Sequence, residues 1–345
     1  MKIGILTFHW ATNYGAILQC YALQEFLREE GHIVEVINYK PRKYDFWFKY
    51  LKRPWLVCHI LKDIVAYKKE KKLRHFRNKM LVQTKRFYLT EELYKSKLYY
   101  DLIISGSDQV LNPSFTIGGE DRPTSVYYLA SFPSSRRIGY AVSFGCNVYP
   151  DSTLEYAKKW ISSFDRIGVR EGTGVSILKQ MNYSGTVEIV PDPTILLGDR
   201  LFEHINVISP SSENYICVYL LRRQINLNRK NVIYIDDYNN PLSMEEWIGT
   251  IRCSKGLVTN SYHGMVVAIL SHVPFVALAD SMNMNDRFYT LLSKVGLLNQ
   301  MTADYSNYES ILENEINWTD VDAKICEFRE VGKNLLAVEN ESNTN

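Results

Sequence analysis

The sequence predicts an α/β protein with two Rossmann-like domains that face each other across a cleft, and with a basic helical insertion in the first domain. Short apolar segments alternate with segments of helical periodicity in both halves of the 345-residue chain, a pattern typical of buried parallel strands joined by helices. A second alternating series begins after Pro191-Asp192-Pro193, where two prolines mark a crossing between domains. These observations predict two similar domains in one chain.

The first half of the chain opens as a βαβ unit. Lys2–Phe8 and His32–Tyr39 are expected strands, and the helical periodicity over Gly15–Glu30 ends at Gly31. Further short elements are expected after the basic insertion: strands at Tyr100–Ser105, Ile138–Ser143 and Ile167–Arg170, and a helix at about Gly172–Met181. The first domain therefore reads as a parallel sheet with helical crossovers.

The second half repeats the alternation. Strands are expected at Tyr215–Leu221, Val232–Ile235, Gly256–Thr259 and Val273–Ala279, and helices at Ser243–Arg252, Arg287–Val295 and Val321–Val338. Ser243 and Glu246 have the spacing of a capping box. Only Arg222–Asn231 joins the first two strands, so a shrunken helix or an irregular link is expected there. The predicted domains are residues 1–190, with an insertion at about 41–95, and 191–320, followed by a C-terminal helix and frayed tail at 321–345.

Composition favours an ordinary globular protein of the cytoplasm. The chain is 46% hydrophobic and 23% charged, which does not suggest disorder. The N-terminus lacks the pattern of a signal peptide, and no run approaches the roughly 18 apolar residues that span a bilayer. Six cysteines occur without a CxxC pair, so we expect buried free thiols rather than metal or redox sites.

The positive charge is concentrated in one segment. Residues 41–90 contain 15 Lys and Arg against 3 acids, so this segment carries +12 and leaves −10 for the rest of a chain whose net charge is +2. Aromatic and aliphatic residues are interleaved with the cations over Tyr44–Phe76. The segment is either a pair of solvated helices or a surface for anionic lipid or a phosphate-bearing substrate. Nucleic acid is disfavoured because no RNA or DNA motif accompanies the cations.

Four polar loops follow predicted strands or precede predicted helices, where ligands bind in open α/β sheets. Together they offer small hydroxyls, a carboxylate, a guanidinium and an imidazole, which suit an anionic ligand beside a polyhydroxylated one. The four loops are Asn13-Tyr14-Gly15, Ser105-Gly106-Ser107-Asp108-Gln109, Val169-Arg170-Glu171-Gly172 and Asn260-Ser261-Tyr262-His263-Gly264. In the last, the start of a helix places free N–H groups and the positive end of its dipole toward an anion.

Each loop also has a structural explanation. Asn13 is a good N-cap, Asp108 suits the cap of the next turn, and Arg170 can form a salt bridge with Glu171 or a remote acid. A lone histidine is more often structural than catalytic, but the place of His263 at a helix start favours a functional role. The first loop contains no GxGxxG, so a dinucleotide enzyme is disfavoured, and no residue cluster has the spacing of metal ligands.

Six segments in a fixed order resemble the polysaccharide pyruvyl transferase family. The resemblance runs from residue 1 to roughly 300 and rests on NYGAILQCYAL (13–23), DLIISGSDQVLN (101–112), IGYAVSFG (138–145), GVREGTGVSIL (168–178), VPDPTILL (190–197) and VTNSYHG (258–264). It implies a GT-B-like fold with the active site in the interdomain cleft. It further implies transfer of the enolpyruvyl group of phosphoenolpyruvate onto two hydroxyls of a sugar, giving a cyclic pyruvate ketal and phosphate in surface polysaccharide biosynthesis.

The resemblance also suggests roles for individual residues. Arg170 would hold the phosphate or carboxylate of the donor, and His263 would bind the phosphate or act as general acid. Asp108 is our candidate for orienting or deprotonating the acceptor hydroxyl. Some family members carry Arg at the position of Ser261, so we expect Arg287, or less favourably Lys255, to supply the missing cation. Asn260 and Gly264 complete the expected donor set in the second domain, and the acceptor set in the first domain is Asn13, Tyr14, Gly15, Ser105, Gly106, Ser107, Asp108 and Gln109.

Partners and rival functions follow from the same comparison. No cofactor or metal is expected, and phosphoenolpyruvate is a co-substrate. The acceptor is expected to be a sugar on a lipid-diphosphate carrier, with the basic insertion holding the carrier or resting on the inner face of the membrane. One rival is a GT-B glycosyltransferase that uses a nucleotide sugar, and another is a non-catalytic scaffold with the same fold.

Overall fold

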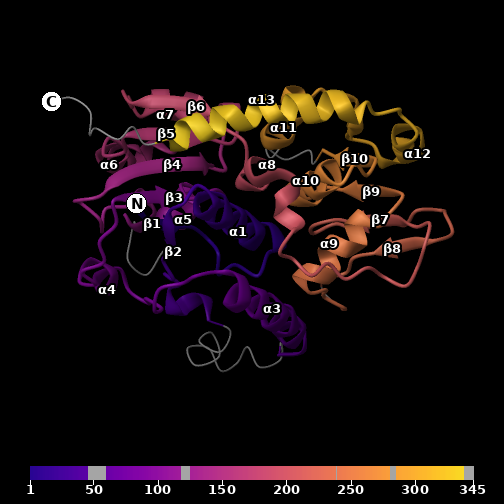
Figure 1. Ribbon diagram of the computed structural model, residues 1–345, viewed down its shortest axis with the longest axis horizontal. Helices are drawn as coiled ribbons and strands as arrows, with labels where there is room; N and C mark the ends of the chain where they lie inside the picture. The colour runs from indigo at the N-terminus through magenta and orange to yellow at the C-terminus, as the bar shows by residue number, and fades with distance from the viewer. Residues whose placement is uncertain (46–59, 118–124, 238, 280–284, 338–345) are drawn as a thin grey trace.

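Two parallel β-sheets, one from each half of the chain, form the centre of the protein (Figure 1). The computed structural model describes residues 1–45, 60–117, 125–237, 239–279 and 285–337. The expected frayed tail, the N-terminal part of the basic insertion at 46–59 and Cys58 lie outside the described residues. The five described cysteines are free, as expected, but the expected burial is confirmed only for Cys20 and Cys217 and is wrong for the half-buried Cys146 and the exposed Cys253 and Cys326.

The first sheet has six strands in the order β2-β1-β3-β4-β5-β6, all parallel. The strands are β1 (Lys2–Leu6), β2 (Ile33–Val36), β3 (Leu102–Ser105), β4 (Arg136–Val142), β5 (Arg166–Val169) and β6 (Thr186–Ile189). The helices of this half are α1 (Tyr14–Glu29), α3 (Ile60–Met80), α4 (Thr90–Tyr94), α5 (Pro113–Ile117), α6 (Asp151–Ile161) and α7 (Gly172–Gln180). All strands predicted here are confirmed; β6 was not predicted, because this edge strand alternates exposed and half-buried residues instead of forming an apolar run.

The second sheet has five strands in the order β11-β10-β9-β7-β8, again parallel. They are β7 (Ile216–Tyr219), β8 (Val232–Tyr234), β9 (Gly256–Thr259), β10 (Phe275–Leu278) and β11 (Met301–Thr302). The helices are α8 (Pro193–Leu197), α9 (Met244–Arg252), α10 (Tyr262–Leu270), α11 (Asp286–Val295), α12 (Tyr308–Leu312) and α13 (Trp318–Leu336). Short 3-10 helices lie at Arg42–Tyr44, Val126–Tyr128, Gly198–Phe202, Leu298–Gln300 and Tyr305–Asn307. The capping box of Ser243 and Glu246 is confirmed, and the link from β7 to β8 is irregular, as expected.

Both sheets reverse their strand order where the polar loops lie. The chain goes from β1 to β2 on one side and to β3 on the other, and from β7 to β8 on one side and to β9 on the other. Such a reversal opens a crevice at the carboxyl ends of the strands, where ligands bind. The loops around Gly15, Ser107 and His263 follow β1, β3 and β9, so the fold places them at these two crevices.

Helix α13 ties the two halves together. It begins beside the second sheet and runs back over the first, where it packs against β4, β5 and β6 (Figure 1). Helix α13 packs closely on β5 at Gly168, because a Cβ added to this glycine would lie 2.5 Å from the Leu335 side chain. Arg329 donates through Nε to the Leu196 carbonyl at 2.9 Å. The C-terminal helix thus belongs to the packing of both halves.

The basic helix α3 is not simply solvated. Its buried face includes Lys69, whose Nζ lies 2.7 Å from Asp237 of the second half. Lys72 pairs with Glu246 at 3.1 Å, again across the two halves. Part of the basic charge is therefore neutralised by acids of the second half, whereas Lys68, one turn before Lys72 in α3, is exposed. No helix among the described residues is long and apolar enough to cross a membrane.

The His9 imidazole makes stability depend on pH. Burial is the largest cause that lowers the pKa of His9 to about 4, and Arg77 lowers it further against hydrogen bonds to Thr7 and Asn38. The folded chain therefore excludes a proton that the unfolded chain binds below pH 6.5. We expect the free energy of unfolding to decrease as the pH is lowered from 6.5 to about 4. The contribution of His9 to this decrease is up to about 1.4 kcal/mol per pH unit.

Urea unfolding of the wild-type chain and of His9→Gln at several pH values measures this contribution. The variant is expected to lose stability less steeply over this range, and equal slopes for both proteins would contradict the assignment to His9.

Candidate active site

A buried carboxylate, Asp192, lies where the two halves meet. It follows β6 directly, precedes α8 and is 0% exposed. Its Oδ2 accepts a hydrogen bond from Ser107 Oγ at 2.8 Å and lies 3.4 Å from Arg170 Nη1. The same oxygen lies 3.5 Å from His263 Nε2, and Thr194 donates to Oδ1 through its amide at 3.0 Å and its hydroxyl at 2.6 Å. One carboxylate therefore joins groups from β3, β5 and α10.

The surroundings keep Asp192 ionised. Burial alone would raise the pKa of its carboxyl group, but the neighbouring His263 and Arg170 and the Thr194 hydroxyl outweigh burial and hold the pKa well below its usual range. A buried charge is tolerated only with such compensation. Asp192 thus binds the Arg170 guanidinium and lies next to the His263 imidazole.

Arg170 lies at the end of β5, with its side chain 1% exposed. Besides Asp192 it pairs with Glu171, whose Oε2 is 3.5 Å from Nε, and its guanidinium lies 5.0 Å from the centre of the Tyr262 ring. Burial lowers the pKa of Arg170, but Glu171 and Asp192 raise it more, so the group stays charged. The salt-bridge explanation is therefore correct for this residue, yet it leaves Nη2 buried without an acceptor among the described residues.

His263 stands in the first turn of α10, against the first half of the chain. A Cβ on Gly15, in the first turn of α1, would lie 2.0 Å from His263 Nδ1, so the two helix starts touch. The Nε2 atom is buried, and the described residues give it no aligned hydrogen bond, since Asp192 lies at 3.5 Å. Gly15 is therefore needed for the close approach of the imidazole.

Arg287 stands in the first turn of α11 and also reaches this place. Burial is the main cause that lowers its pKa to about 10, and the neighbouring Arg170 lowers it further, whereas Glu171, Asp108 and Tyr262 raise it. Its Nε is buried with no acceptor among the described residues. The structure therefore brings Arg287 beside Arg170 and Asp108, as expected from the sequence.

Three buried side-chain nitrogens of this region have no hydrogen-bond partner among the described residues: Arg170 Nη2, His263 Nε2 and Arg287 Nε. Native structures rarely leave buried polar groups unpaired, and such a group calls for an explanation. The start of α10 adds the amides of Tyr262 and His263, which belong to the first-turn groups that a helix leaves without an internal partner. This arrangement is suited to an anion with several oxygen atoms.

Asp108 adopts a strained backbone at the edge of this group. Its φ is +95°, a conformation that side chains rarely adopt, and such strain is common at functional sites. Its Oδ1 accepts from the amide of the adjacent residue, Gln109, at 2.8 Å, a contact that does not cap the following turn. Gln109 lines a small cleft together with Glu171 and Arg287, so the end of β3 and the start of α11 share one opening.

Several residues of the expected site have structural roles instead. The Tyr14 side chain is buried, stacks on Trp247 and donates to the Leu242 carbonyl at 2.8 Å, so it joins the two halves and does not face an acceptor. Ser105 donates to the buried Tyr127 carbonyl. Gly106 lies close to Thr7, because a Cβ added to this glycine would be 3.0 Å from the Thr7 Cβ. These corrections remove the side chains of Tyr14 and Ser105 from the acceptor set.

The donor loop is corrected in the same way. The Asn260 side chain binds both polar groups of the Leu221 backbone. Its Oδ1 accepts from the amide at 2.6 Å, and its Nδ2 donates to the carbonyl at 3.1 Å. Ser261 is the N-cap of α10 and accepts from the Gly264 amide at 3.2 Å, so that amide is not free for a ligand. Asn13 likewise caps α1 through the Ala16 amide. Of the expected donor residues, the structure brings together Arg170, His263 and Arg287.

Sequence reasoning missed Asp192 as a site residue. The segment Pro191-Asp192-Pro193 was interpreted only as a crossing between domains, although VPDPTILL was one of the six recognised segments. A carboxylate between two prolines, inside one of the recognised segments, was the available signal. Among the described residues, no group of three His, Cys, Asp or Glu could hold a metal ion.

Comparisons with known proteins show the family and the fold of the chain. A family model described as polysaccharide pyruvyl transferase matches residues 13–281, and no curated protein matches at a significant level. A protein described as a UDP-N-acetylglucosamine 2-epimerase from Listeria monocytogenes is similar in structure, with 10% identity over 100% of this chain and 97% of that one and a TM-score of 0.51. The UDP-GlcNAc 2-epimerase of Methanocaldococcus jannaschii has 11% identity over 97% and 99%, with a TM-score of 0.50. The predicted fold, two Rossmann-like domains in a GT-B-like arrangement, is confirmed.

The contact between Gly15 and His263 gives a direct test of the site geometry. In Gly15→Ala the new methyl group would meet the imidazole at 2.0 Å, so the ring must leave its position at a cost of about 1–3 kcal/mol. We expect the ring resonances of His263 to shift in NMR spectra and the protein to lose stability by about that amount.

Gly172→Ala is the matched control, because the nearest atom to its added Cβ is 4.0 Å away. Unchanged His263 resonances in Gly15→Ala would contradict the described packing of the two helix starts.

Proposed function

The chain belongs to the polysaccharide pyruvyl transferase family, and on this premise we propose that it moves the enolpyruvyl group of phosphoenolpyruvate onto two hydroxyls of a sugar. The products are a cyclic pyruvate ketal on the sugar and inorganic phosphate. The observation that carries the proposal is the convergence of three buried donors without acceptors, from Arg170, His263 and Arg287. A small ligand with a phosphate and a carboxylate group would supply the missing acceptors.

Each of these side chains has a proposed task. Arg170 is held by Asp192 and Glu171 on two of its nitrogens, so only Nη2 is left for the donor. Arg287 would bind the same donor from the other side and replace the arginine expected at Ser261. Because both guanidinium groups are buried, their attraction for an anion is screened less than at the surface.

The chemistry needs one proton at carbon and two oxygen attacks. In the first step an acceptor hydroxyl oxygen attacks C2 of phosphoenolpyruvate, while a proton adds to C3 and turns the methylene into a methyl group. In the second step the other hydroxyl oxygen attacks C2, and phosphate leaves with the electron pair of its bond to C2. Of the two hydroxyl protons released, one replaces the proton given to C3 and the other leaves with phosphate. We assign proton delivery to His263 and acceptance of the first hydroxyl proton to Asp108.

Asp192 is a positioning residue in this proposal. It touches both Arg170 and His263, and as a buried anion it compensates their charges while no donor is bound. Its remaining contacts, with Ser107 and Thr194, fix the carboxylate itself. A rigid support of this kind holds His263 and Arg170 in fixed positions relative to each other.

The acceptor is proposed to be a sugar on its way to a surface polysaccharide, carried on a lipid diphosphate. Exposed cations of α3, including Lys68, Lys71, Arg74 and Lys79, support a contact between this helix and an anionic membrane surface. Lys69 and Lys72 are excluded from that contact, because they pair with acids of the second half.

The first test is replacement of the proposed acid. His263→Ala is expected to release phosphate from phosphoenolpyruvate, in the presence of a panel of lipid-linked sugars, at least about 100-fold more slowly than the wild type, since general acid catalysis contributes that much or more. Thermal unfolding should show an intact fold.

His272→Asn is the matched control. It changes an exposed histidine that follows the same helix and pairs with Asp322 at 3.0 Å, and Asn tolerates the local φ of +53°. Near wild-type phosphate release by His263→Ala would remove this residue from the mechanism. Consumption of a nucleotide sugar without phosphoenolpyruvate would favour a glycosyltransferase.

The second test addresses Asp192. Asp192→Asn removes the charge that aligns His263, so kcat should fall at least about tenfold, whereas KM for phosphoenolpyruvate should stay the same or fall because the site becomes more positive. Ser107→Ala, which removes an uncharged partner of the same carboxylate, should lower kcat less. A rise in KM with unchanged kcat would contradict the positioning role.

A further inference from the structure

Lys69 is a buried cation at the contact between the two halves. It lies on the face of α3 that packs on α1, together with Leu73 and Phe76, and its side chain is only 8% exposed. Phe76 contacts the Tyr21 ring of α1 at 5.8 Å between ring centres, so this face of α3 belongs to the first half. The Lys69 ammonium group, however, pairs with Asp237 of the second half at 2.7 Å. A lysine is rarely buried in this way unless it is paired.

On the side of the first half, Lys69 contacts the start of α1. Its Nζ lies 4.2 Å from the centre of the Tyr14 ring, a distance at which a cation is attracted to the face of an aromatic ring. Tyr14 is the first residue of α1, and the next residue, Gly15, is the one that approaches the His263 imidazole. A short path of contacts therefore leads from Lys69 through the first turn of α1 to His263.

On the side of the second half, Lys69 is connected to the start of α10 through β7 and β9. The Oδ2 atom of Asp237, which binds Lys69, also accepts a hydrogen bond from the Tyr219 hydroxyl at 3.2 Å. The Tyr219 carbonyl accepts from the Thr259 hydroxyl at 2.6 Å, and the oxygen of that hydroxyl accepts from the Ser261 amide at 3.0 Å. Ser261 is the N-cap of α10, so this second path ends at the start of that helix.

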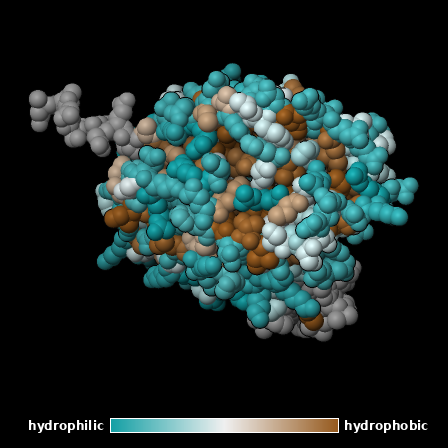
Figure 2. Space-filling view, turned by 45° about the vertical axis from the view of Figure 1, so that its right-hand side comes forward, coloured by the Kyte–Doolittle hydropathy of each residue, from teal (hydrophilic) through white to brown (hydrophobic). Residues whose placement is uncertain are grey.

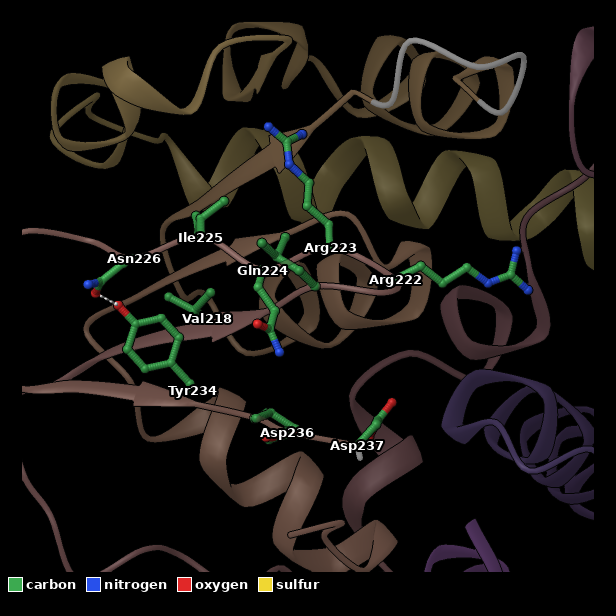
Figure 3. A pocket seen from close by; sticks show the side chains of 11 residues that line it. Val218, Arg222, Arg223, Gln224, Ile225, Asn226, Tyr234, Asp236 and Asp237 are labelled. Atoms are coloured by element: carbon green, nitrogen blue, oxygen red, sulfur yellow. Dashed lines mark hydrogen bonds between the residues drawn. The ribbon is translucent and has the colours of Figure 1, made fainter. Parts of the chain in front are cut away.

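Asp237 depends on these two partners for its orientation. Its other carboxylate oxygen, Oδ1, is buried and has no hydrogen-bond partner among the described residues. Asp237 lines a cavity of about 740 Å³ at the carboxyl ends of β7 and β8, and Figure 3 shows it at the end nearer the indigo helix α1. Val218 and Ile235 give this cavity an apolar part, and Figure 2 likewise shows apolar surface toward the middle of one face of the molecule. The cavity thus leaves Lys69 and Tyr219 to hold the carboxylate.

We propose that Lys69 is a positioning residue of the candidate active site. By binding Tyr14 and Asp237 at once, it holds the starts of α1 and α10 together. It thereby fixes the position of the His263 imidazole relative to Asp192. The effect on the position of His263 is independent of the proposed function, whereas the effect on catalysis rests on that function.

Lys72 provides a matched control on the same helix. It also reaches the second half, where it pairs with Glu246 at 3.1 Å, but its side chain is 41% exposed. Glu246 has a second partner, because it accepts from the Ser243 amide at 2.6 Å in the capping box of α9. The ion pair of Lys72 thus joins α3 to α9 and not to the start of α10, so its loss should leave His263 in place.

NMR spectra of the His263 ring in Lys69→Met and Lys72→Met test the proposal. Each substitution removes one positive charge from α3 and keeps a long unbranched side chain, and His263→Ala identifies the resonances. We expect Lys69→Met to shift the ring resonances of His263 and Lys72→Met to leave them unchanged. Shifts of equal size in the two variants, or no shift in either, would overturn the proposal.

Two further variants keep the test decisive if Lys69→Met unfolds. That variant leaves the carboxylate of Asp237 largely buried without its cation, which is destabilising. Lys69→Met with Asp237→Asn removes both charges and should still shift the His263 resonances, because the contact that joins the halves is lost. Lys69→Arg keeps a cation beside Tyr14 and Asp237 and should shift them less. Unchanged His263 resonances in the double variant would contradict the positioning role.

The kinetics of phosphate release from phosphoenolpyruvate separate this proposal from the proposed function. With sugar acceptors present, Lys69→Met should lower kcat at least about tenfold, because a small displacement of a catalytic group has that effect or more. KM for phosphoenolpyruvate should change little, since Arg170 and Arg287 still bind the donor. A lower kcat with unshifted His263 resonances would contradict the positioning role. Shifted resonances in a protein whose wild type does not use phosphoenolpyruvate would support that role and contradict the transferase.

Discussion

The buried carboxylate of Asp192 is the interaction on which the arrangement of the two halves depends. A charge that is 0% exposed must be compensated by nearby cations and hydrogen-bond donors. Its partners come from three separate places, Ser107 after β3, Arg170 at the end of β5 and His263 in α10. The carboxylate therefore fixes the distance between loops that different sheets supply, and it does so at the reversal point of each sheet.

The same network leaves a surplus of donors. Asp192 and Glu171 occupy two nitrogens of Arg170 but not the third, and neither engages Arg287 Nε in a hydrogen bond. Burying donors that have no acceptor lowers the stability of the fold. An anion that accepts hydrogen bonds from these donors restores that free energy when it binds. Electrostatic groups fixed before the ligand arrives need no reorganisation during a reaction. The stable framework and the proposed catalysis thus rest on one group of contacts.

Sequence patterns predicted the framework and part of the site. Continuous apolar runs located β1, β3 and β9, and helix starts with polar residues located His263 and Arg287, because such signals are local in the chain. Asn260 and Asp192 could not be assigned in this way. In the sequence, a polar residue at a strand end looks the same whether it stabilises a loop, caps a helix or binds a ligand. Which of these roles it has depends on partners far away in the sequence, such as Leu221 for Asn260 and Arg170 for Asp192.

A crystal structure of the chain with phosphoenolpyruvate bound is the most direct test of the central claim, that the unpaired donors around Asp192 form a donor site. The account predicts that phosphate or carboxylate oxygens lie within hydrogen-bond distance of Arg170 Nη2, Arg287 Nε and His263 Nε2. A phosphoenolpyruvate molecule bound elsewhere, with these three nitrogens still without a hydrogen-bond partner, would contradict it.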